Sequence, residues 1–483
     1  MLPIILTLVM AFTFRKTLWA LAAGVISGAF ILSQYSVPTT LVYIVKTGQS
    51  QFYANGQWQL WHINVLIAML LLGSLTQLLA RGGAVAQFSD WLTLRLHSPR
   101  QARLGVVLLG FMVFIDGIFS CLSVGHVCRP LQTSYGISRT QLAYFVDSTA
   151  SPLCSLLPFS SWGPYVMAIL AGLTLLNESP ISAFIEIAQL NFYAVAVLLL
   201  AIWVAWSGVG FKLDTVASIE PEATTKAVGD PWLLALPMLS LLILSMLLTL
   251  ISGAQASTSH SVIQWLAKAD IGAAMRNACL LSLALSCWLF WRSGRTCLQL
   301  LIDLCHGIKS MLFAMAILVF TWLIGQVIKD LQIASMLAGL AKIYLSPKFL
   351  VAGLFILCAV MAFGTGSSWG TFAIMLPIGA QIAHTLDSSL LLVTLSAVMA
   401  GSVFGDHCSP ISDTSVLSAT SSGCDPYQHV VTQLPFALIA ASASVIGFQL
   451  INLQVNTWLV WLIVLLFLVV AMLLMKLREG KKV

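Results

Sequence analysis

Charged side chains are scarce in this chain, and apolar ones dominate it. Charged residues make up 8% of the 483 positions and apolar residues 59%, against roughly 25% and 45–50% in a typical soluble domain. No soluble fold buries that much apolar surface, and the apolar residues recur in runs along the whole sequence. The composition therefore predicts a polytopic membrane protein with the bilayer as its main solvent.

Several signatures of pumps, enzymes and metal sites are also missing. The phosphate-binding string GxxxxGK[ST] does not occur, so transport would be driven by ion gradients and needs no nucleotide or other cofactor. The Tyr-Asp and Gly-x-Gly-Asp strings of intramembrane aspartyl proteases are absent, which argues against an enzyme. The ten cysteines include no CxxC pair, and we interpret them as reduced thiols that pack as small apolar groups.

The net charge of +6 comes from basic residues scattered between apolar runs. This pattern does not predict nucleic-acid binding; it fits the rule that basic loops of membrane proteins stay on the cytoplasmic side. The first apolar run, Met1 to Phe14, has no basic start or cleavage site, so we expect it to remain as a membrane segment. Lys476, Arg478, Lys481 and Lys482 crowd the C-terminus, which predicts a cytoplasmic C-terminus in a bacterial inner membrane.

The order of apolar and polar stretches predicts an all-α polytopic fold with about 12 transmembrane helices. A polar linker at 211–231 divides the chain into a first half, 1–210, and a second half, 232–483. Each half contains two interrupted apolar segments rich in Gly, Ser, Thr and Pro, and matching interruptions mark the binding site of inverted-repeat transporters. We therefore expect two inverted-repeat halves with paired re-entrant or broken helices, at Phe114–Gly125, Asp147–Gly163, Phe363–Pro377 and Asp406–Gly423.

Four aspartates lie within or beside these apolar segments, namely Asp116, Asp147, Asp406 and Asp413. An aspartate at the centre of a bilayer costs about 2.5–3.5 kcal/mol, so each needs a compensating partner or a function. Capping of a helix N-terminus is the alternative interpretation, because Asp followed by Ser or Thr is a capping signal. We predict that all four bind cations or protons.

Hydroxyl-bearing residues surround these carboxylates. Pro410 interrupts the segment between Asp406 and Asp413, which frees backbone carbonyls and creates an oxygen-rich nest suited to sodium. The glycine-rich stretch 363–371 is a second candidate loop, although small residues also serve close helix packing. The predicted substrate or ion loop residues are Ser148, Thr149, Thr365, Ser367, Ser368, Thr371, Ser409, Ser412 and Thr414.

His407 follows Asp406 directly and is a candidate for tuning the pKa of that carboxyl. His407 and Cys408 together could also suggest a transition-metal site. Adjacent side chains seldom converge on one ion, and no second cluster has metal-ligand spacing. We therefore expect no transition metal at this position.

The string Gly405-Asp-His-Cys-Ser-Pro-Ile-Ser-Asp-Thr414, continuing to Pro435, resembles the hallmark of NhaC-type sodium/proton antiporters. Gly364–Pro377 and Arg129–Thr149 resemble further motifs of that family, so the similarity spans roughly residues 100 to 450. The resemblance implies a multi-pass inner-membrane transporter whose acidic residues bind sodium or protons competitively. It implies ion binding at the four aspartates, with sodium at Asp147, Asp406 and Asp413.

Two departures from the family pattern keep a second function open. The paired Asp-Asp of the family is Asp116-Gly117 here, and Tyr165-Val166 stands where the family has a glutamate. Relatives include exchangers of organic acids, so the alternative to sodium/proton exchange by alternating access is sodium- or proton-coupled transport of a small organic acid or amino acid. The expected partners are sodium, protons and lipid, with a small organic solute in the alternative function. The sequence leaves open whether the protein forms a homodimer.

Overall fold

The computed structural model is almost entirely helical. It describes residues 3, 5–7, 9–10, 17–54, 56–173, 175–176, 178–211, 229–258, 261–331 and 347–480. Before the expected linker the elements are α2 (Thr17–Leu32), α3 (Val37–Ser50), the antiparallel strands β1 (Tyr53–Ala54) and β2 (Gln57–Trp58), α4 (Leu60–Arg81), α5 (Ala84–Thr93), α6 (Pro99–Met112), α7 (Gly117–Val127), α8 (Pro130–Tyr135), α9 (Arg139–Leu156), α10 (Trp162–Ala171), α11 (Pro180–Gln189) and α12 (Phe192–Ser207).

The elements after the linker are helical throughout the described residues. They are α13 (Trp232–Ala256), α14 (Val262–Lys268), α15 (Ile271–Arg292), α16 (Cys297–Asp330), the 3-10 turn η1 (Pro347–Phe349), α18 (Leu350–Thr365), α19 (Ser368–Leu386), the 3-10 turn η2 (Ser388–Leu390), α20 (Leu391–His407), α21 (Asp413–Ser422), α22 (Pro426–Asn452) and α23 (Thr457–Gly480). Most of the expected linker at 211–231 lies outside the described residues. The boundary between the two halves therefore stays a prediction.

The expected polytopic all-α architecture is confirmed. Among the described residues, seven helices are long and apolar enough to cross a membrane, and the bent pairs α2–α3 and α11–α12 raise the number to nine. The sequence predicts about 12 full crossings, with the runs shorter than about 20 residues as candidate half-helices. In the structure α7, α10 and α18 have 11, 10 and 16 residues, too few for a full span at 1.5 Å per residue.

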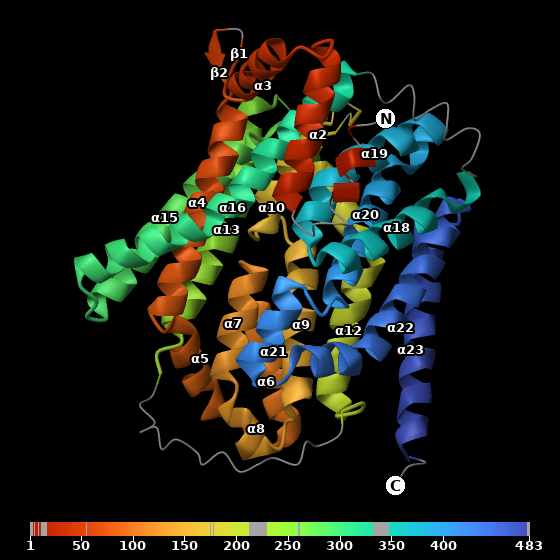
Figure 1. Cartoon of the computed structure of the whole chain (residues 1–483). Helices are drawn as coiled ribbons and strands as arrows, with labels where there is room; N and C mark the ends of the chain where they lie inside the picture. Colours follow the sequence, from red (N-terminus) through yellow and green to blue (C-terminus); the bar gives the residue numbers. More distant parts are fainter. Residues whose placement is uncertain are drawn as a thin grey trace.

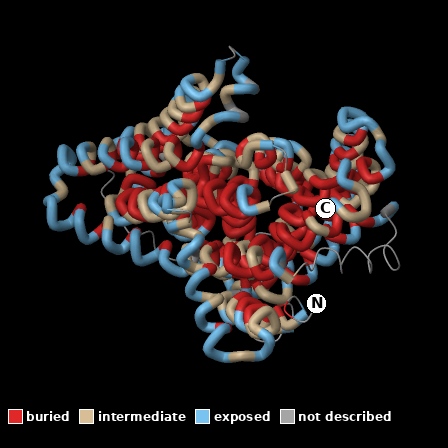
Figure 2. The backbone as a smooth tube through the Cα atoms, turned by 90° about the horizontal axis from the view of Figure 1, so that it is seen from above, coloured by how far each residue is buried: buried red, intermediate tan, exposed pale blue. Residues whose placement is uncertain are grey.

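The distribution of side chains also suits a bilayer (Figure 2). Buried residues gather in the centre of the bundle, while the outer helices expose large apolar groups. On α23, Trp458 is 85% exposed and Leu462 and Leu466 are more than half exposed. In lipid such side chains need no protein partner, whereas in water they would form an aggregation-prone patch. Six of the ten cysteines are buried, whereas Cys297 and Cys305 are exposed and so do not pack as the small apolar groups that the sequence predicted.

Helix breaks occur in all four segments where the sequence predicted interruptions. The breaks lie between α6 and α7, between α9 and α10, between α18 and α19, and between α20 and α21. At three of them a polar side chain caps the following helix, because Asp116, Ser367 and Ser412 accept a hydrogen bond from a backbone N–H three residues ahead. Asp116 is therefore a helix cap as well as a candidate ligand.

Two of the breaks touch each other closely. Gly366 has φ +65°, and a Cβ at this position would lie 2.7 Å from the backbone oxygen of Ile411. Ser409 donates a hydrogen bond of 2.8 Å to the carbonyl oxygen of Phe363. Glycine is required at 366 for both the left-handed backbone and the close approach, so the α18–α19 and α20–α21 breaks form one unit.

Helix α21 ties the second half of the chain to the first (Figure 1), since it packs against α7 and α9. Arg129 donates hydrogen bonds of 2.5 and 2.6 Å to the carbonyl oxygens of Ser421 and Thr420, and Gln132 donates one of 2.8 Å to that of Ser422. These donors satisfy carbonyls in the last turn of α21 that have no partner within the helix. The first half thereby fixes the position of α21.

Candidate functional site

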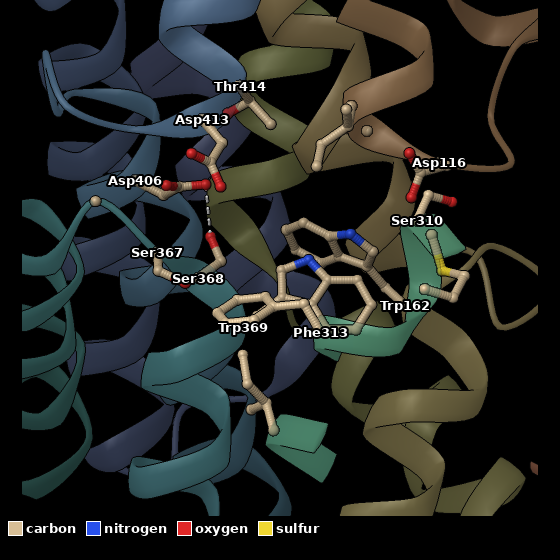
Figure 3. Close-up of a pocket in the computed structure, with 15 residues that line it drawn as sticks. Asp116, Trp162, Ser310, Phe313, Ser367, Ser368, Trp369, Asp406, Asp413 and Thr414 are labelled. Atoms are coloured by element: carbon tan, nitrogen blue, oxygen red, sulfur yellow. Dashed lines mark hydrogen bonds between the residues drawn. The ribbon is translucent and has the colours of Figure 1, made fainter. Parts of the chain in front are cut away.

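Three of the four helix breaks, together with the start of α10 just after the fourth, line one pocket (Figure 3). Its volume is about 110 Å³, enough for a small ion with part of its hydration shell. The α6–α7, α18–α19 and α20–α21 breaks, the start of α10 and one side of α16 line it, through Asp116, Gly117, Ile118, Trp162, Ser310, Met311, Phe313, Ile317, Gly366, Ser367, Ser368, Trp369, Asp406, Asp413 and Thr414. We call it the break pocket.

Three of the four predicted aspartates line the break pocket. Asp406 and Asp413 approach each other from either side of the α20–α21 break, and Asp116 lies across the pocket from them (Figure 3). Asp406 and Asp116 are 4% and 5% exposed. The sequence placed Asp406 and Asp413 in one interrupted segment and Asp116 in another, and the fold brings all three to a single cavity.

Hydrogen bonds fix two of these carboxylates. Asp406 Oδ2 accepts a hydrogen bond of 2.9 Å from Ser368 Oγ. Asp116 Oδ1 accepts one of 2.9 Å from the backbone N–H of Phe119, and its Oδ2 accepts one of 2.8 Å from Ser161 Oγ. Each carboxylate keeps lone pairs free for a further ligand, because an ionised carboxylate offers about four acceptor sites.

Aromatic side chains close one side of the break pocket. Trp162 and Trp369 meet edge to face with ring centroids 5.9 Å apart, and Trp162 packs on Phe372 at 5.4 Å. The Tyr165 hydroxyl donates a hydrogen bond of 2.8 Å to the carbonyl oxygen of Trp369. Sequence reasoning did not single out these residues, although two tryptophans directly after Ser161 and Ser368 were a usable signal.

The chemistry of the break pocket suits a hard cation. Its carboxylates, the hydroxyls of Ser368 and Thr414 and the backbone carbonyls at the breaks supply oxygen ligands, which hard cations prefer. Within the described ranges, no three His, Cys, Asp or Glu side chains stand close enough together to hold a metal ion by themselves. A bound cation would therefore combine one or two carboxylates with hydroxyl and backbone oxygens.

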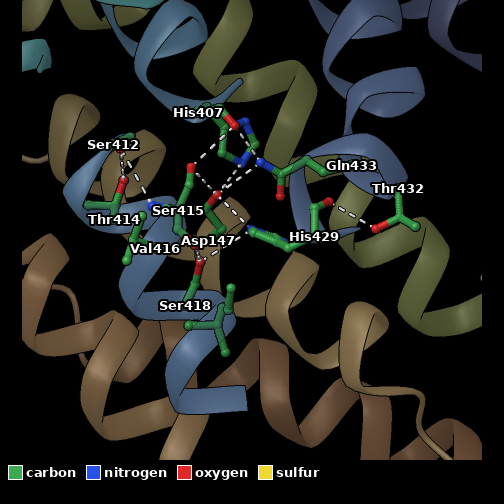
Figure 4. A network of polar contacts seen from close by, with 12 residues as sticks. Asp147, His407, Ser412, Thr414, Ser415, Val416, Ser418, His429, Thr432 and Gln433 are labelled. Carbon is green, nitrogen blue, oxygen red and sulfur yellow. Dashed lines mark hydrogen bonds and ion pairs between the residues drawn. The ribbon is translucent and has the colours of Figure 1, made fainter. Parts of the chain in front are cut away.

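The fourth aspartate, Asp147, does not line the break pocket. It is fully buried in α9 and lies in a separate network of polar contacts (Figure 4). Its Oδ2 accepts hydrogen bonds from Gln433 Nε2 at 2.9 Å and from Ser415 Oγ at 3.1 Å, and it lies 3.1 Å from His429 Nε2. His407 Nε2 is 3.7 Å from the same oxygen. We call these five residues the Asp147 network.

The two clusters lie back to back on the α20–α21 break. Asp406 and Thr414 line the break pocket, whereas their sequence neighbours His407 and Ser415 belong to the Asp147 network. The ring of His407, which the sequence suggested for tuning the pKa of Asp406, faces Asp147 instead. The sodium site predicted from Asp147, Asp406 and Asp413 is divided between two adjacent clusters.

The predicted hydroxyl residues also separate into groups. Ser367, Ser368 and Thr414 line the break pocket. Ser409 joins two breaks, and Ser412 caps α21 while its hydroxyl meets that of Thr414 at 3.1 Å. The remaining four lie outside the pocket lining: Ser148 is buried in α9, and Thr149, Thr365 and Thr371 donate to carbonyls of their own helices.

The comparison with known families decides the class of the protein. The profile of the Na+/H+ antiporter family matches residues 153–453, well over half of the chain. The chain belongs to the Na+/H+ antiporter family. It is therefore a multi-pass membrane transporter and not an enzyme, and the resemblance inferred from the Gly405–Thr414 string is confirmed.

Individual relatives agree with this assignment. The chain is 37% identical over 469 residues to an uncharacterised protein of Haemophilus influenzae, which covers 93% of this chain and 90% of that protein. It is 33% identical over 155 residues to the malate-2H(+)/Na(+)-lactate antiporter of Bacillus subtilis, which covers 30% of this chain and 32% of that one. The fold resembles that of the YdaH transporter of Alcanivorax borkumensis, with a TM-score of 0.56 and 14% identity over 86% of this chain and 89% of that one.

Proposed function

We propose that this antiporter-family member exchanges sodium for protons and binds sodium in the break pocket. The observation that carries the proposal is the convergence of three helix breaks, the start of α10 and three aspartates on one small cavity. Broken helices turn backbone oxygens towards a site at membrane depth, which is how secondary transporters coordinate sodium. Asp406 and Asp413, together with Ser368 and Thr414, are the proposed sodium ligands, and Asp116 faces them across the cavity.

Alternating access is the proposed mechanism. The aromatic side chains Trp162, Tyr165, Trp369 and Phe372 separate the break pocket from a larger cavity further along α10, α16 and α19. Sodium would enter from one side, and movement of the helix breaks would then open the pocket to the other. Because the α18–α19 and α20–α21 breaks are tied together at Gly366 and Ser409, they would move as one unit.

The proposed orientation places the C-terminus in the cytoplasm of a bacterium. The C-terminal end of α23 lies at the same end of the bundle as α5 and α8, opposite the β1–β2 hairpin (Figure 1). Arg95, Arg100 and Arg129 belong to the segments at this end. Enrichment of basic residues near short loops is the signature of the cytoplasmic face.

The test is sodium uptake into proteoliposomes driven by a pH gradient. Asp406→Asn and Asp413→Asn should each reduce uptake to background, because an amide cannot supply the negative charge that compensates sodium. Asp425→Asn is the matched control, since Asp425 is an exposed cap of α22 and asparagine caps equally well. Uptake by the Asp406 and Asp413 variants at the level of the control would refute the site.

A second candidate function is coupled transport of a small organic acid. The larger cavity has a volume of about 610 Å³ and is lined in part by Gln51, Gln59, Gln326, Gln381 and Lys329. Amide groups and one lysine suit a carboxylate, and the Bacillus subtilis relative named above is a malate/lactate antiporter by name. If C2–C4 carboxylates raise the thermal stability of the detergent-purified protein and sodium alone does not, this function replaces simple sodium/proton exchange.

A further inference from the structure

The surroundings of Asp147 are wrong for a sodium ion. Its Oδ2 faces the Nε2 atoms of Gln433 at 2.9 Å, His429 at 3.1 Å and His407 at 3.7 Å, and one hydroxyl, that of Ser415. Hard cations take oxygen ligands, whereas amide and protonated imidazole nitrogens are hydrogen-bond donors. The groups around Asp147 therefore donate hydrogen bonds to its carboxylate, whereas a sodium site would direct oxygen lone pairs at the ion.

The orientation of Gln433 is fixed by its neighbours. Its Nε2 donates to Asp147 Oδ2 and, at 2.6 Å, to the backbone oxygen of His407. Two acceptors face the same nitrogen, so the amide cannot turn its oxygen towards Asp147 without losing both bonds. Gln433 therefore fixes the position of the Asp147 carboxylate relative to the C-terminal end of α20, whichever group carries a proton.

Several atoms of the network have unused bonding capacity. Asp147 Oδ1, His429 Nδ1 and His407 Nε2 are buried and have no hydrogen-bond partner among the residues that the structure describes. The other ring nitrogen of His407, Nδ1, is 2.8 Å from the Tyr193 hydroxyl. A proton needs no cavity of its own, only a lone pair and a nearby acceptor, and His429 Nε2 and Asp147 Oδ2, which are 3.1 Å apart, provide both.

The charge of the network depends on one proton. With Asp147 ionised and both imidazoles neutral, a fully buried cluster has a net charge of −1, which is costly at membrane depth. One proton shared between His429 Nε2 and Asp147 Oδ2 makes the cluster neutral. The titratable groups that interact electrostatically with Asp147 from the packed elements are Asp406, His407 and Cys408 at the end of α20, His429 of α22, Tyr193 of α12 and Cys121 of α7.

We propose that the Asp147 network is a proton-binding site separate from the sodium-binding break pocket, with His429 as its main proton carrier. The two sites are coupled because they share the α20–α21 break. Asp406 before the break and Thr414 after it line the break pocket, and their neighbours His407 and Ser415 belong to the Asp147 network. This inference rests on the proposed sodium/proton exchange. It differs from exchange at a single carboxylate cluster, in which both ions compete for the same oxygens.

The test uses the full-length protein in proteoliposomes and the variant His429→Gln. With one proton displaced per sodium, the apparent sodium affinity of the wild type changes by about tenfold per pH unit. In His429→Gln this dependence should become flat, while sodium/sodium exchange without a pH gradient continues. Ser442→Ala is the matched control on α22, because Ser442 is exposed and its hydroxyl bonds only to its own helix.

If the apparent sodium affinity of His429→Gln still changes tenfold per pH unit, the inference is overturned, because proton binding then belongs to the break pocket alone. The wild-type protein provides a second measurement that does not depend on folding of the variant: ¹⁵N spectra of histidine-labelled protein across roughly pH 5 to 9. We expect at least one buried imidazole to titrate, with a midpoint that saturating sodium shifts. Absence of any such titration also refutes the proposal, whereas a wild type without sodium/proton exchange would refute only the proposed function.

Discussion

Replacing Gly125 by alanine tests whether the close contact between α7 and α21 holds the two halves together. A Cβ at position 125 would lie 1.9 Å from Ser421 Oγ and 2.7 Å from Ser421 Cβ. Rotating the hydroxyl away would break its 2.6 Å hydrogen bond to the carbonyl oxygen of Cys121, at a cost of about 1 kcal/mol. The Cβ contact would still force the helices apart, which costs about 1–3 kcal/mol.

The better helix propensity of alanine offsets up to about 1 kcal/mol of this. We therefore expect Gly125→Ala to reduce stability by about 1–3 kcal/mol, seen as a lower apparent Tm of the protein in detergent. Gly353→Ala on α18 is the control, because no atom lies within 4 Å of a Cβ there, and it should be neutral or stabilising. If the two variants unfold at the same temperature, the α7–α21 contact does not have the closeness that the structure gives it.

Three further predictions concern the scaffold around the site. Asp303→Asn removes the buried partner of Arg81 and Arg295 and should lower the free energy of unfolding by about 2–3 kcal/mol. The loss stays below the 3–5 kcal/mol of a fully buried pair because Arg81 is 45% exposed. Unchanged thermal stability would contradict this. Arg129→Gln should lower both thermal stability and sodium affinity, because the last turn of α21 loses two charged donors; an effect on stability alone would mean that α21 does not position the site. Cys297 is exposed near the end of α4, where Arg295 bonds to the carbonyl oxygen of Arg81. It should react with an impermeant maleimide in inverted vesicles and not in intact cells. The opposite result would reverse the proposed orientation.

The sequence predicted the positions of the helix breaks well because the residues that cause them act locally. Pro410 removes a backbone donor, and Gly366 permits a left-handed turn followed by a capping serine, so each break follows from a few adjacent residues. The aspartates were recognisable for a similar reason, since a charge among apolar neighbours is conspicuous whatever the tertiary structure. These two signals were sufficient to single out the four carboxylates, but not to show that Asp116, and not Asp147, shares a pocket with Asp406 and Asp413.

The separate position of Asp147 could not be predicted from its local sequence. Asp147 and Asp406 both follow apolar residues and precede small polar ones, yet only Asp406 lines the break pocket. The difference arises because α22 packs against α9 and brings His429 and Gln433 to Asp147 across more than 280 positions of sequence. Contacts of this kind depend on helix packing, and a single sequence carries no pattern that reports them.

The arrangement of the two sites gives a physical reason for coupling between them. Successive residues on a helix point about 100° apart, so Asp406 and His407, at the last turn of α20, face different clusters from the same short piece of backbone. A movement of the α20–α21 break that opens the break pocket must also move His407 relative to Asp147. Under the proposed mechanism, protonation of the network then favours one position of the break and sodium the other, and exchange follows without both ions sharing one ligand.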